Sequence, residues 1–438
     1  MRRILAHPRS RIARPPRPPA DQAIPGLPAR LAALRLLHGV LALGRPLDTL
    51  LGGTLGSLPP NDRGLAHAIV LGVLRHLPDL DAAIDSATPR PLPDDARARL
   101  ALRIALAQAW VLGTPPHAVT ATALALLEGG PRRLAHAVLT RLLGEGAAWA
   151  DPPTLPASWG DRWTAAYGAD ATLRIAAALG QEPPLDLTLR DATQTAQWTE
   201  QLGGVSLAPG HVRLPRAGDV TALPGFAEGV WWVQDLAASL PARLLAPAPG
   251  EAVLDLCAAP GGKTLQLAAM GARVTAVDIA ERRLALVAQN LARTRLIAEL
   301  VTADALAWAP PGPQTAILLD APCSATGTAR RHPDVLHLKA ARDFAPVIET
   351  QAALLARAAG WLAPGGRMIY CTCSLEPEEG EAQIERLLAA DPAMRLVPVD
   401  AAGLPSGLAS APRGWLRTLP GQIAGGIDGF FIAHLARA

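Results

Sequence analysis

Hydrophobic residues recur at helical spacing through the first third of the chain. One such stripe consists of Leu31, Leu34, Leu37 and Leu41. The apolar run from Ile104 to Leu127 is interrupted by Gly113-Thr114-Pro115-Pro116-His117, which predicts two short helices instead of one membrane-spanning helix. Asn61-Asp62-Arg63 is expected to cap a helix that runs from Gly64 to His76. The pattern predicts a bundle of roughly five or more helices over residues 25–150.

The pattern changes after residue 150. Residues 151–228 are richer in Pro, Gly, Asp and Thr, and two short runs alternate between apolar and polar residues, Leu185 to Leu189 and Val212 to Leu214. Such alternation is typical of half-buried strands. We expect this segment to be a linking α/β subdomain with one or two helices and a small β element.

From residue 229 onward, short apolar runs alternate with helical segments. The predicted strands are Val253–Cys257, Val274–Val277, Leu300–Thr302, Ile317–Leu319, Met368–Cys371 and Gly429–Leu435. The predicted helices are Thr264–Met270, Glu281–Arg293, Phe344–Leu362 and Glu378–Ala390. Alternating elements of this length predict a mostly parallel sheet with helices on both faces. Residues 229–438 are therefore expected to form an α/β domain.

Charge is distributed unevenly, although the formal net charge is only +3. Residues 1–24 carry six Arg and one Asp, residues 25–150 carry twelve Arg against nine acidic residues, and the rest of the chain has more acids than bases. Any polyanionic partner is therefore expected to contact the N-terminal third. Residues 1–24 have no apolar segment of the secretory type and are predicted to be a basic, disordered tail.

All four cysteines lie in the C-terminal half: Cys257, Cys323, Cys371 and Cys373. Four cysteines in 438 residues are too few for a disulfide framework. Their spacing does not form paired zinc knuckles either. These features predict a cytoplasmic protein without a metal site or a membrane span.

A glycine-rich segment, Asp255-Leu-Cys-Ala-Ala-Pro-Gly-Gly-Lys-Thr264, lies between the first predicted strand and helix of the α/β domain. Gly261 and Gly262 allow a tight turn and close approach of a ligand, and the next helix offers free N–H groups. The segment is neither a P-loop nor a G-x-G-x-x-G fingerprint. Asp278 and Asp304 follow the next two strands, where carboxylates can bind ribose hydroxyls and an adenine edge. We therefore predict a site for an adenosine-bearing ligand at the carboxyl edge of the sheet.

Two further segments place a cysteine at or just beyond the end of a strand, Leu319-Asp-Ala-Pro-Cys-Ser-Ala-Thr-Gly327 and Tyr370-Cys-Thr-Cys-Ser374. A single cysteine is more often a small core residue. Two cysteines at neighbouring strand ends, after a glycine-rich first turn, indicate a catalytic site at this edge of the sheet.

The segments DLCAAPGGKT, LDAPCSATG and YCTCSLEPEE together resemble the Sun/Fmu family of ribosomal RNA cytosine-C5 methyltransferases. Supporting stretches are Trp232–Asp235, Arg330–Asp334 and Asp428–Phe431, while Gly72–Arg75 and Pro115–Ala118 resemble the NusB-like RNA-binding domain joined to these enzymes. The resemblance covers residues 28–438 and implies an all-α NusB-like domain followed by a Rossmann-like class I methyltransferase domain. Two positions depart from the family pattern: Gly380 replaces an Asn, and residues 137–141 read Ala-Val-Leu-Thr-Arg.

The resemblance implies S-adenosyl-L-methionine as methyl donor and a cytidine of 16S (small-subunit) rRNA as target. Cys373 would be the nucleophile, and Cys323 would assist release of the methylated product. Asp278 would bind the donor's ribose, Asp304 its adenine side, and Asp320 would lie near both donor and target base. The donor's amino-acid end would be lined by Cys257, Ala258, Ala259, Pro260, Gly261, Gly262 and Lys263. The enzyme is expected to act as a monomer, with rRNA and not DNA as its partner.

Cytosine chemistry accounts for these residue types. C5 of cytosine is a poor nucleophile, and addition of a thiolate at C6 makes C5 enamine-like, so that it can attack a methyl sulfonium. Asp320 can hydrogen-bond the N3/N4 edge of the ring as charge develops there. Because C6 is inaccessible in a stacked duplex, the target cytidine must be flipped out or single-stranded.

Three other functions fit the sequence less well. A tRNA cytosine-C5 methyltransferase would share the chemistry, but the NusB-like domain favours rRNA. A non-catalytic RNA-binding assembly protein would show degraded motifs, whereas both cysteines and the three strand-end acids are present. A DNA cytosine methyltransferase would carry Glu-Asn-Val after the Pro-Cys cysteine and a long recognition domain, and the sequence has neither.

Overall fold

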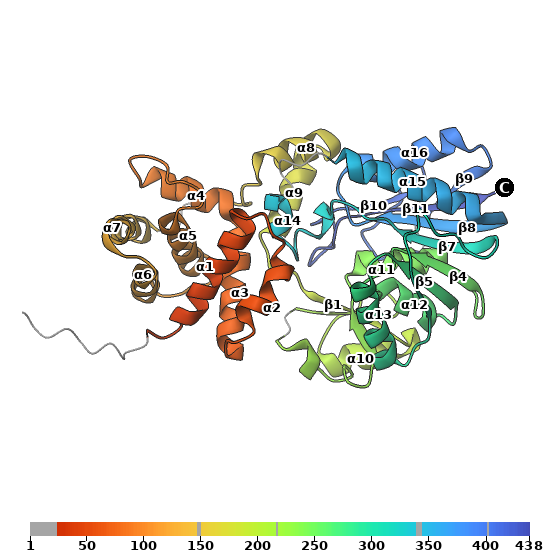
Figure 1. Ribbon diagram of the computed structural model, residues 1–438, viewed down its shortest axis with the longest axis horizontal. Helices are drawn as coiled ribbons and strands as arrows, with labels where there is room; N and C mark the ends of the chain where they lie inside the picture. Colours follow the sequence, from red (N-terminus) through yellow and green to blue (C-terminus); the bar gives the residue numbers. More distant parts are fainter. Residues whose placement is uncertain (1–23, 147–149, 216–217, 339–343, 401–402) are drawn as a thin grey trace, which may run out of the picture.

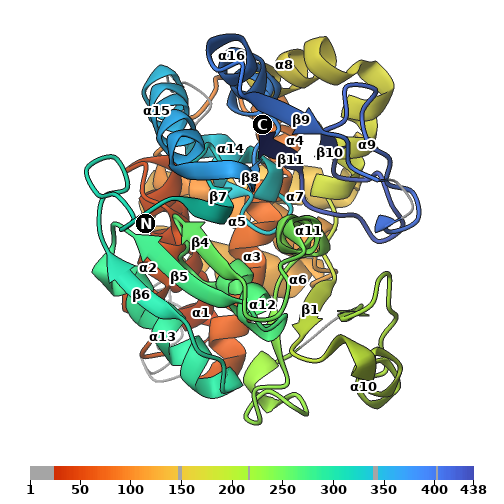
Figure 2. The same ribbon diagram turned by 90° about the vertical axis from the view of Figure 1, so that its right-hand side faces the viewer.

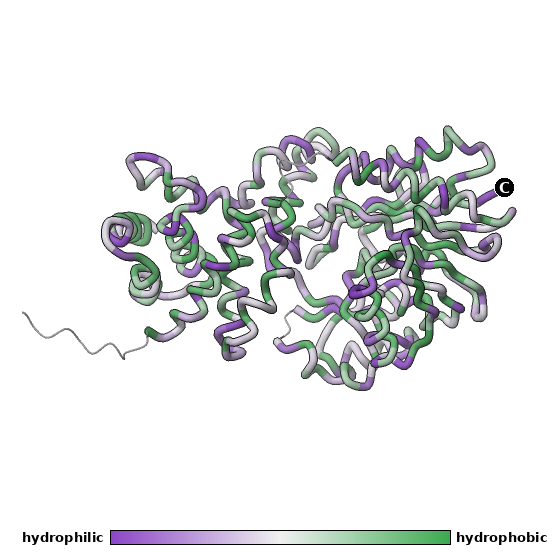
Figure 3. Tube along the Cα trace, viewed as in Figure 1, coloured by the Kyte–Doolittle hydropathy of each residue, from purple (hydrophilic) through white to green (hydrophobic). Residues whose placement is uncertain are grey.

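The computed structural model describes residues 24–146, 150–215, 218–338, 344–400 and 403–438. Seven helices at the N-terminal end form one part of the molecule, and a large sheet with its helices forms the other (Figure 1). Hydrophobic residues concentrate inside each part, and hydrophilic residues lie on helix exteriors and loops (Figure 3). The predicted tail lies, apart from Ile24, outside the described residues. Among the residues described, no helix has the length and apolar character needed to cross a membrane.

The N-terminal part is the predicted helical bundle. Its helices are α1 (Leu27–Leu41), α2 (Leu47–Leu55), α3 (Pro60–Arg75), α4 (Leu77–Ser86), α5 (Arg97–Trp110), α6 (Pro116–Ala125) and α7 (Gly129–Glu145). The central helix, α5, packs against α1, α3, α4, α6 and α7. The break at Pro115-Pro116 separates α5 from α6, as expected. The predicted cap of α3 was wrong: residues 61–63 lie inside its first turn, because Pro60 begins the helix and Pro59 precedes it without a side-chain cap.

Two arginines of α5 are buried in the bundle, where they form ion pairs with acidic residues from outside the helix. The Arg103 guanidinium contacts both Asp81 oxygens, at 2.7 and 2.8 Å. Arg99 lies beside the same carboxylate at 3.2 Å and binds Asp85 at 2.6 Å. Arg103 is 2% and Arg99 4% exposed, so each needs a carboxylate partner to offset the cost of burying its charge.

We expect Asp81→Ala to lower the free energy of unfolding by about 3 kcal/mol, because it leaves Arg103 buried without its main counter-charge. Asp94→Ala is the matched control: its side chain is 88% exposed although it also contacts Arg103, so its loss should cost less than about 1 kcal/mol. Urea denaturation of both variants tests this, and equal losses would contradict it.

The segment between the two parts contains two helices and a small sheet. Helices α8 (Ala157–Tyr167) and α9 (Ala169–Leu179) are joined to the large domain, where Trp159 Nε1 donates to the Leu336 carbonyl at 2.8 Å. The strands β1 (Leu185–Leu189), β2 (His211–Leu214) and β3 (Trp231–Val233) form an antiparallel sheet in the order β2-β1-β3. The short helix α10 (Thr195–Leu202) precedes β2. The sheet thus extends past residue 228, because β3 pairs with β1.

The large sheet has the strand order β10-β11-β8-β7-β4-β5-β6, and β9 pairs with β11. Five strands are parallel: β4 (Ala252–Leu256), β5 (Arg273–Asp278), β6 (Glu299–Thr302), β7 (Gln314–Asp320) and β8 (Leu362–Thr372). The others, β9 (Met394–Val397), β10 (Leu416–Thr418) and β11 (Phe430–Arg437), form an antiparallel edge. The mostly parallel sheet is therefore confirmed, and its last strand runs antiparallel to β8.

Helices cover both faces of this sheet (Figure 2). In β8, Ile369 and Cys371 face one core, while Met368 and Tyr370 face the other, as the two-residue period of a strand requires. The first core includes α11 (Leu236–Leu245) and α12 (Gly262–Ala269), and the second includes α15 (Ala345–Trp361) and α16 (Glu381–Ala390). Helix α13 (Glu281–Thr294) follows β5, and α14 (Asp334–Leu338) lies beside the helical bundle.

Candidate active site

The carboxyl ends of the parallel strands bring the predicted site residues to one edge of the sheet. The loop after β4 reverses sharply, with Cys257 at φ 58° and Gly261 at φ 102°. A Cβ at Gly261 would lie 2.9 Å from a Val287 methyl group of α13. Glycine is therefore required at this turn, which leads directly into the N-terminus of α12.

The two predicted ribose and adenine carboxylates lie at the ends of β5 and β6. Asp278 is 3% exposed and accepts hydrogen bonds from the Ala259 N–H at 3.1 Å and the Ala280 N–H at 2.9 Å. Its carboxylate therefore ties the glycine-rich loop to the end of β5. Asp304 is exposed and accepts the Leu306 N–H at 2.9 Å.

Lys263 and Asp320 form a short ion pair between the glycine-rich loop and the end of β7. Lys263 Nζ lies 2.7 Å from Asp320 Oδ2 and 5.1 Å from the centre of the Phe430 ring. The Cys371 thiol donates to Asp320 Oδ1 at 3.4 Å. Burial lowers the pKa of Lys263, but the Asp320 carboxylate outweighs it and raises that pKa above its ordinary value. Lys263 is therefore a fixed positive charge at the site.

Cys323 and Cys373 meet across the ends of β7 and β8, with 3.4 Å between their sulfur atoms. Contact with Cys373 and burial together raise the pKa of Cys323 well above its ordinary value. Cys323 is thus a neutral thiol whose S–H can donate to the sulfur of Cys373. The Ser324 N–H and hydroxyl donate to Glu379, which holds this loop in place.

The other cysteines are poor nucleophiles. Burial raises the pKa of Cys257 to about 12 and that of Cys371 well above its ordinary value.

Asp255, beneath the glycine-rich loop, is fully buried and accepts the Thr264 hydroxyl at 2.6 Å. Burial raises the pKa of Asp255 to about 7.

A cavity of about 510 Å³ lies above these residues. Its lining includes Ala258, Pro260, Gly261, Gly262, Lys263, Asp320 and Cys373 from the predicted set. Cys257, Ala259, Asp278, Asp304 and Cys323 do not line this cavity. Of the two cysteines proposed for catalysis, Cys373 is therefore the one that a base in the cavity can meet.

Sequence reasoning missed a buried ionic group in the cavity wall. Arg331 donates to Asp235 at 2.8 Å and to Asp428 at 3.3 Å, and all three residues line the cavity. Burial, together with the neighbouring Asp235, raises the pKa of Asp428 to about 7. All three belong to stretches that support the family resemblance, which was the available signal, although the sequence assigned them no role.

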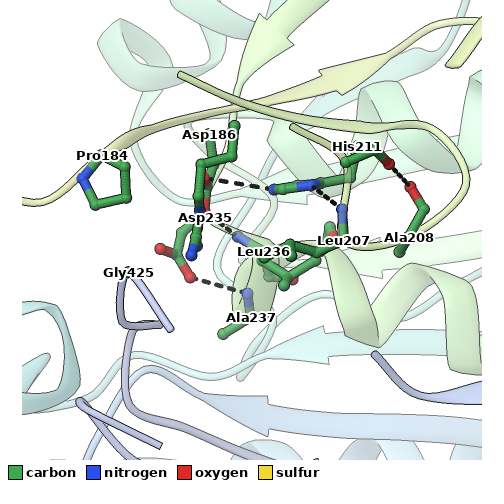
Figure 4. Close-up of polar contacts among 12 residues, drawn as sticks. Pro184, Asp186, Leu207, Ala208, His211, Asp235, Leu236, Ala237 and Gly425 are labelled. Atoms are coloured by element: carbon green, nitrogen blue, oxygen red, sulfur yellow. Dashed lines mark hydrogen bonds and ion pairs between the residues drawn. The ribbon is translucent and has the colours of Figure 1, made fainter. Parts of the chain in front are cut away.

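The same wall is joined to the small sheet through Asp186 (Figure 4). Its carboxylate accepts the Leu236 N–H at 3.1 Å and lies 3.4 Å from His211 Nε2. Because His211 Nδ1 accepts the Leu207 N–H at 3.3 Å, Nε2 is the ring nitrogen that faces Asp186. The small sheet therefore supports the start of α11 and, with it, the cavity wall.

The loop after Cys323 also contacts the helical bundle. The Asp334 carboxylate accepts the Leu47 N–H at 3.0 Å, His337 Nε2 lies 2.8 Å from the Leu74 carbonyl, and Arg75 donates to the Arg330 carbonyl at 3.1 Å. One continuous segment thus joins the candidate active site to the bundle.

Comparison with known proteins agrees with this division of the chain. Residues 242–436 match the family described as 16S rRNA methyltransferase RsmB/F. Residues 27–131 match the NusB family. The two matches correspond to the large α/β domain and to the helical bundle.

Similar proteins extend over nearly the whole chain. The ribosomal RNA small subunit methyltransferase B of Xylella fastidiosa (strain Temecula1) is 38% identical over 94% of this chain and 98% of its own length. The crystal structure of PH0851 shares the fold, with a TM-score of 0.71 and 22% identity over 94% of this chain and 99% of that chain. A methyltransferase homolog from Pyrococcus horikoshii is 26% identical, with a TM-score of 0.55 over 68% of this chain and 98% of its own.

Proposed function

Because the chain belongs to the RsmB/F family of 16S rRNA methyltransferases, we propose that it methylates C5 of a cytidine in 16S rRNA through a covalent bond to Cys373. The contact of 3.4 Å between the Cys323 and Cys373 sulfurs carries this proposal, since C5 methylation needs a thiol to add at C6 and then leave. The Lys263–Asp320 pair beside them supplies the groups that bind the ring edge. In this proposal, the protein methylates its RNA in the cytoplasm and acts as a monomer.

The residues around the glycine-rich loop suit S-adenosyl-L-methionine. Gly261 lets the backbone turn without a side chain in the way, and the start of α12 presents unpaired N–H groups to a carboxylate. Asp278, at the end of β5, occupies the position from which a carboxylate binds ribose hydroxyls. When bound, the donor supplies an electrophilic methyl group.

The protein side chains would perform the remaining steps on the cytosine ring. The Cys373 thiolate forms a bond to C6, which moves electron density to C5. C5 then bonds to the methyl group, and the electron pair of the broken methyl–sulfur bond would remain on the donor's sulfur as a neutral thioether. The C5 proton then leaves to a base, the C6–S bond breaks, and the thiolate of Cys373 is restored. Asp320 accepts a hydrogen bond from the N4 amino edge throughout.

Bisulfite sequencing of 16S rRNA from cells with and without this protein tests the proposal. One protected cytidine should lose its protection when the protein is absent and regain it with the wild-type gene but not with Cys373→Ala. Full protection in the deletion strain would refute the rRNA assignment, and a protected tRNA cytidine that disappears would instead indicate a tRNA enzyme.

We expect Asp278→Ala to weaken S-adenosyl-L-methionine binding about tenfold or more, because a charge-assisted hydrogen bond to the ribose contributes about one to three kcal/mol. Calorimetric titration measures the affinity. Glu281→Ala, an exposed carboxylate in the first turn of α13, is the matched control and should bind normally. Unchanged affinity in Asp278→Ala would remove its assigned role.

The helical bundle is proposed to bind the RNA backbone. Its core lies within residues 29–142, so it is expected to fold as an isolated fragment of residues 1–150. We expect that fragment to bind single-stranded rRNA segments with an affinity that falls steeply as salt rises. Filter binding at two salt concentrations measures this, and a folded fragment that does not bind at low salt would show the basic residues to be structural.

A further inference from the structure

The lining of the catalytic cavity includes side chains that the proposed chemistry does not use. These are Phe226, Asn290 and Arg293. Near Cys373, the polar groups of the lining include the Lys263–Asp320 pair, which is already assigned to the target base. Phe226, Asn290 and Arg293 have no role in that chemistry, and they combine an aromatic ring with polar groups that retain bonding capacity.

Phe226 is held in place by its neighbours. The Arg293 guanidinium lies over its ring, 4.4 Å from the ring centre. The Trp231 ring packs beside it at 5.6 Å. Arg293 Nη1 donates to the Phe226 and Trp231 carbonyls at 2.9 and 3.0 Å. A half-buried ring fixed in this way offers its remaining surface to the cavity without further ordering.

Asn290 and Arg293 provide the polar groups. Asn290 is half-buried on α13, one turn before Arg293, and its side-chain amide makes no hydrogen bond within the part of the chain that the structure describes. Arg293 donates through Nη1 alone among those residues, which leaves Nε and Nη2. An amide can read a base edge, and a guanidinium can bind a phosphate.

We propose that Phe226, Asn290 and Arg293 form a subsite for a nucleotide that flanks the target cytidine in the same RNA strand. The inference rests on the proposed function, since it takes a single-stranded RNA as the ligand. Proteins that bind single-stranded RNA combine aromatic stacking, base-edge hydrogen bonds and backbone cations, which are the three groups found here. The single cavity shared with Cys373 places the subsite along the path of the strand that delivers the cytidine.

The test uses the full-length enzyme and short synthetic RNAs centred on the cytidine that bisulfite sequencing identifies. In separate RNAs, each neighbouring nucleotide is made abasic. For the wild-type enzyme, kcat/KM should fall about tenfold or more at one of these positions, because base–aromatic stacking is lost. Phe226→Leu should show a similar fall with the intact RNA and no further fall with that abasic RNA. Asn290→Ala should alter the preference among bases at the same position.

Two controls keep the result specific. Gln289→Ala, an exposed neighbour on α13 outside the cavity lining, should behave as wild type, and donor affinity should be unchanged in every variant. Wild-type kinetics for Asn290→Ala, or a loss confined to donor binding, would overturn the subsite. Because the Asn290 side-chain amide makes no hydrogen bond to the residues that the structure describes, this holds even if Phe226→Leu is unstable. Formation of 5-methylcytidine by the wild-type enzyme is scored separately, so failure of the subsite leaves the proposed function standing.

Discussion

Replacement of Cys323 by alanine is expected to leave the protein covalently attached to its RNA. The Cys323 thiol lies 3.4 Å from the Cys373 sulfur, and its pKa is raised by contact with Cys373 and by burial, so it remains protonated at neutral pH. In that form it can donate to the sulfur of Cys373 as the C6–S bond breaks. Without the Cys323 thiol, addition to C6 and methyl transfer still proceed, but cleavage of the bond between Cys373 and C6 slows. Denaturing electrophoresis with labelled RNA should show a shifted band.

Two other cysteine variants make this result specific. Cys373→Ala removes the proposed nucleophile, so it should be inactive and form no shifted band. Cys371→Ala changes a buried thiol on β8 that donates to Asp320, so any slowing of methylation should occur without an accumulated complex. A stable complex with Cys373→Ala and none with Cys323→Ala would reverse the two roles. Normal activity in both Cys373→Ala and Cys323→Ala, with no shifted band in either, would refute cysteine-based catalysis.

The sequence predicted where the candidate site residues lie in the fold wherever the topology of a parallel sheet determines their position. Carboxyl ends of neighbouring parallel strands meet at one edge, so segments ending β7 and β8 had to place Cys323 and Cys373 near each other. Short continuous apolar runs likewise predicted the central strands of the large sheet, which are buried on both faces. These inferences need only strand order and direction, and no detail of side-chain packing.

Contacts between loops could not be predicted in this way. Asp235, Arg331 and Asp428 come from three loops far apart in the sequence and meet only after the domain has folded. The basic character of the helical bundle was also misleading in part. Arg99 and Arg103 are neutralised by acids inside the bundle, so they are not free to bind RNA, and net charge alone cannot reveal this.

Asp320→Asn is expected to lower the rate of methyl transfer at saturating donor about a hundredfold or more. Removal of one preorganised electrostatic partner of a developing charge typically costs a factor of about 100 to 1000. The asparagine has nearly the same shape, but it replaces one acceptor oxygen with an amide and loses the charge that balances Lys263. Single-turnover kinetics separate this effect from donor binding, which calorimetry measures independently.

Lys263→Met provides the complementary half of the test. Lys263 Nζ is 2.7 Å from Asp320 Oδ2 and is nearly buried, so its removal leaves the carboxylate beside the cavity without its counter-charge. Breaking such a pair is costly in a region shielded from water, and the methyl-transfer rate should again fall about a hundredfold. If the pair acts as one unit, the double variant should be no slower than the slower single variant. Effects that multiply in the double variant would show that Lys263 and Asp320 act independently.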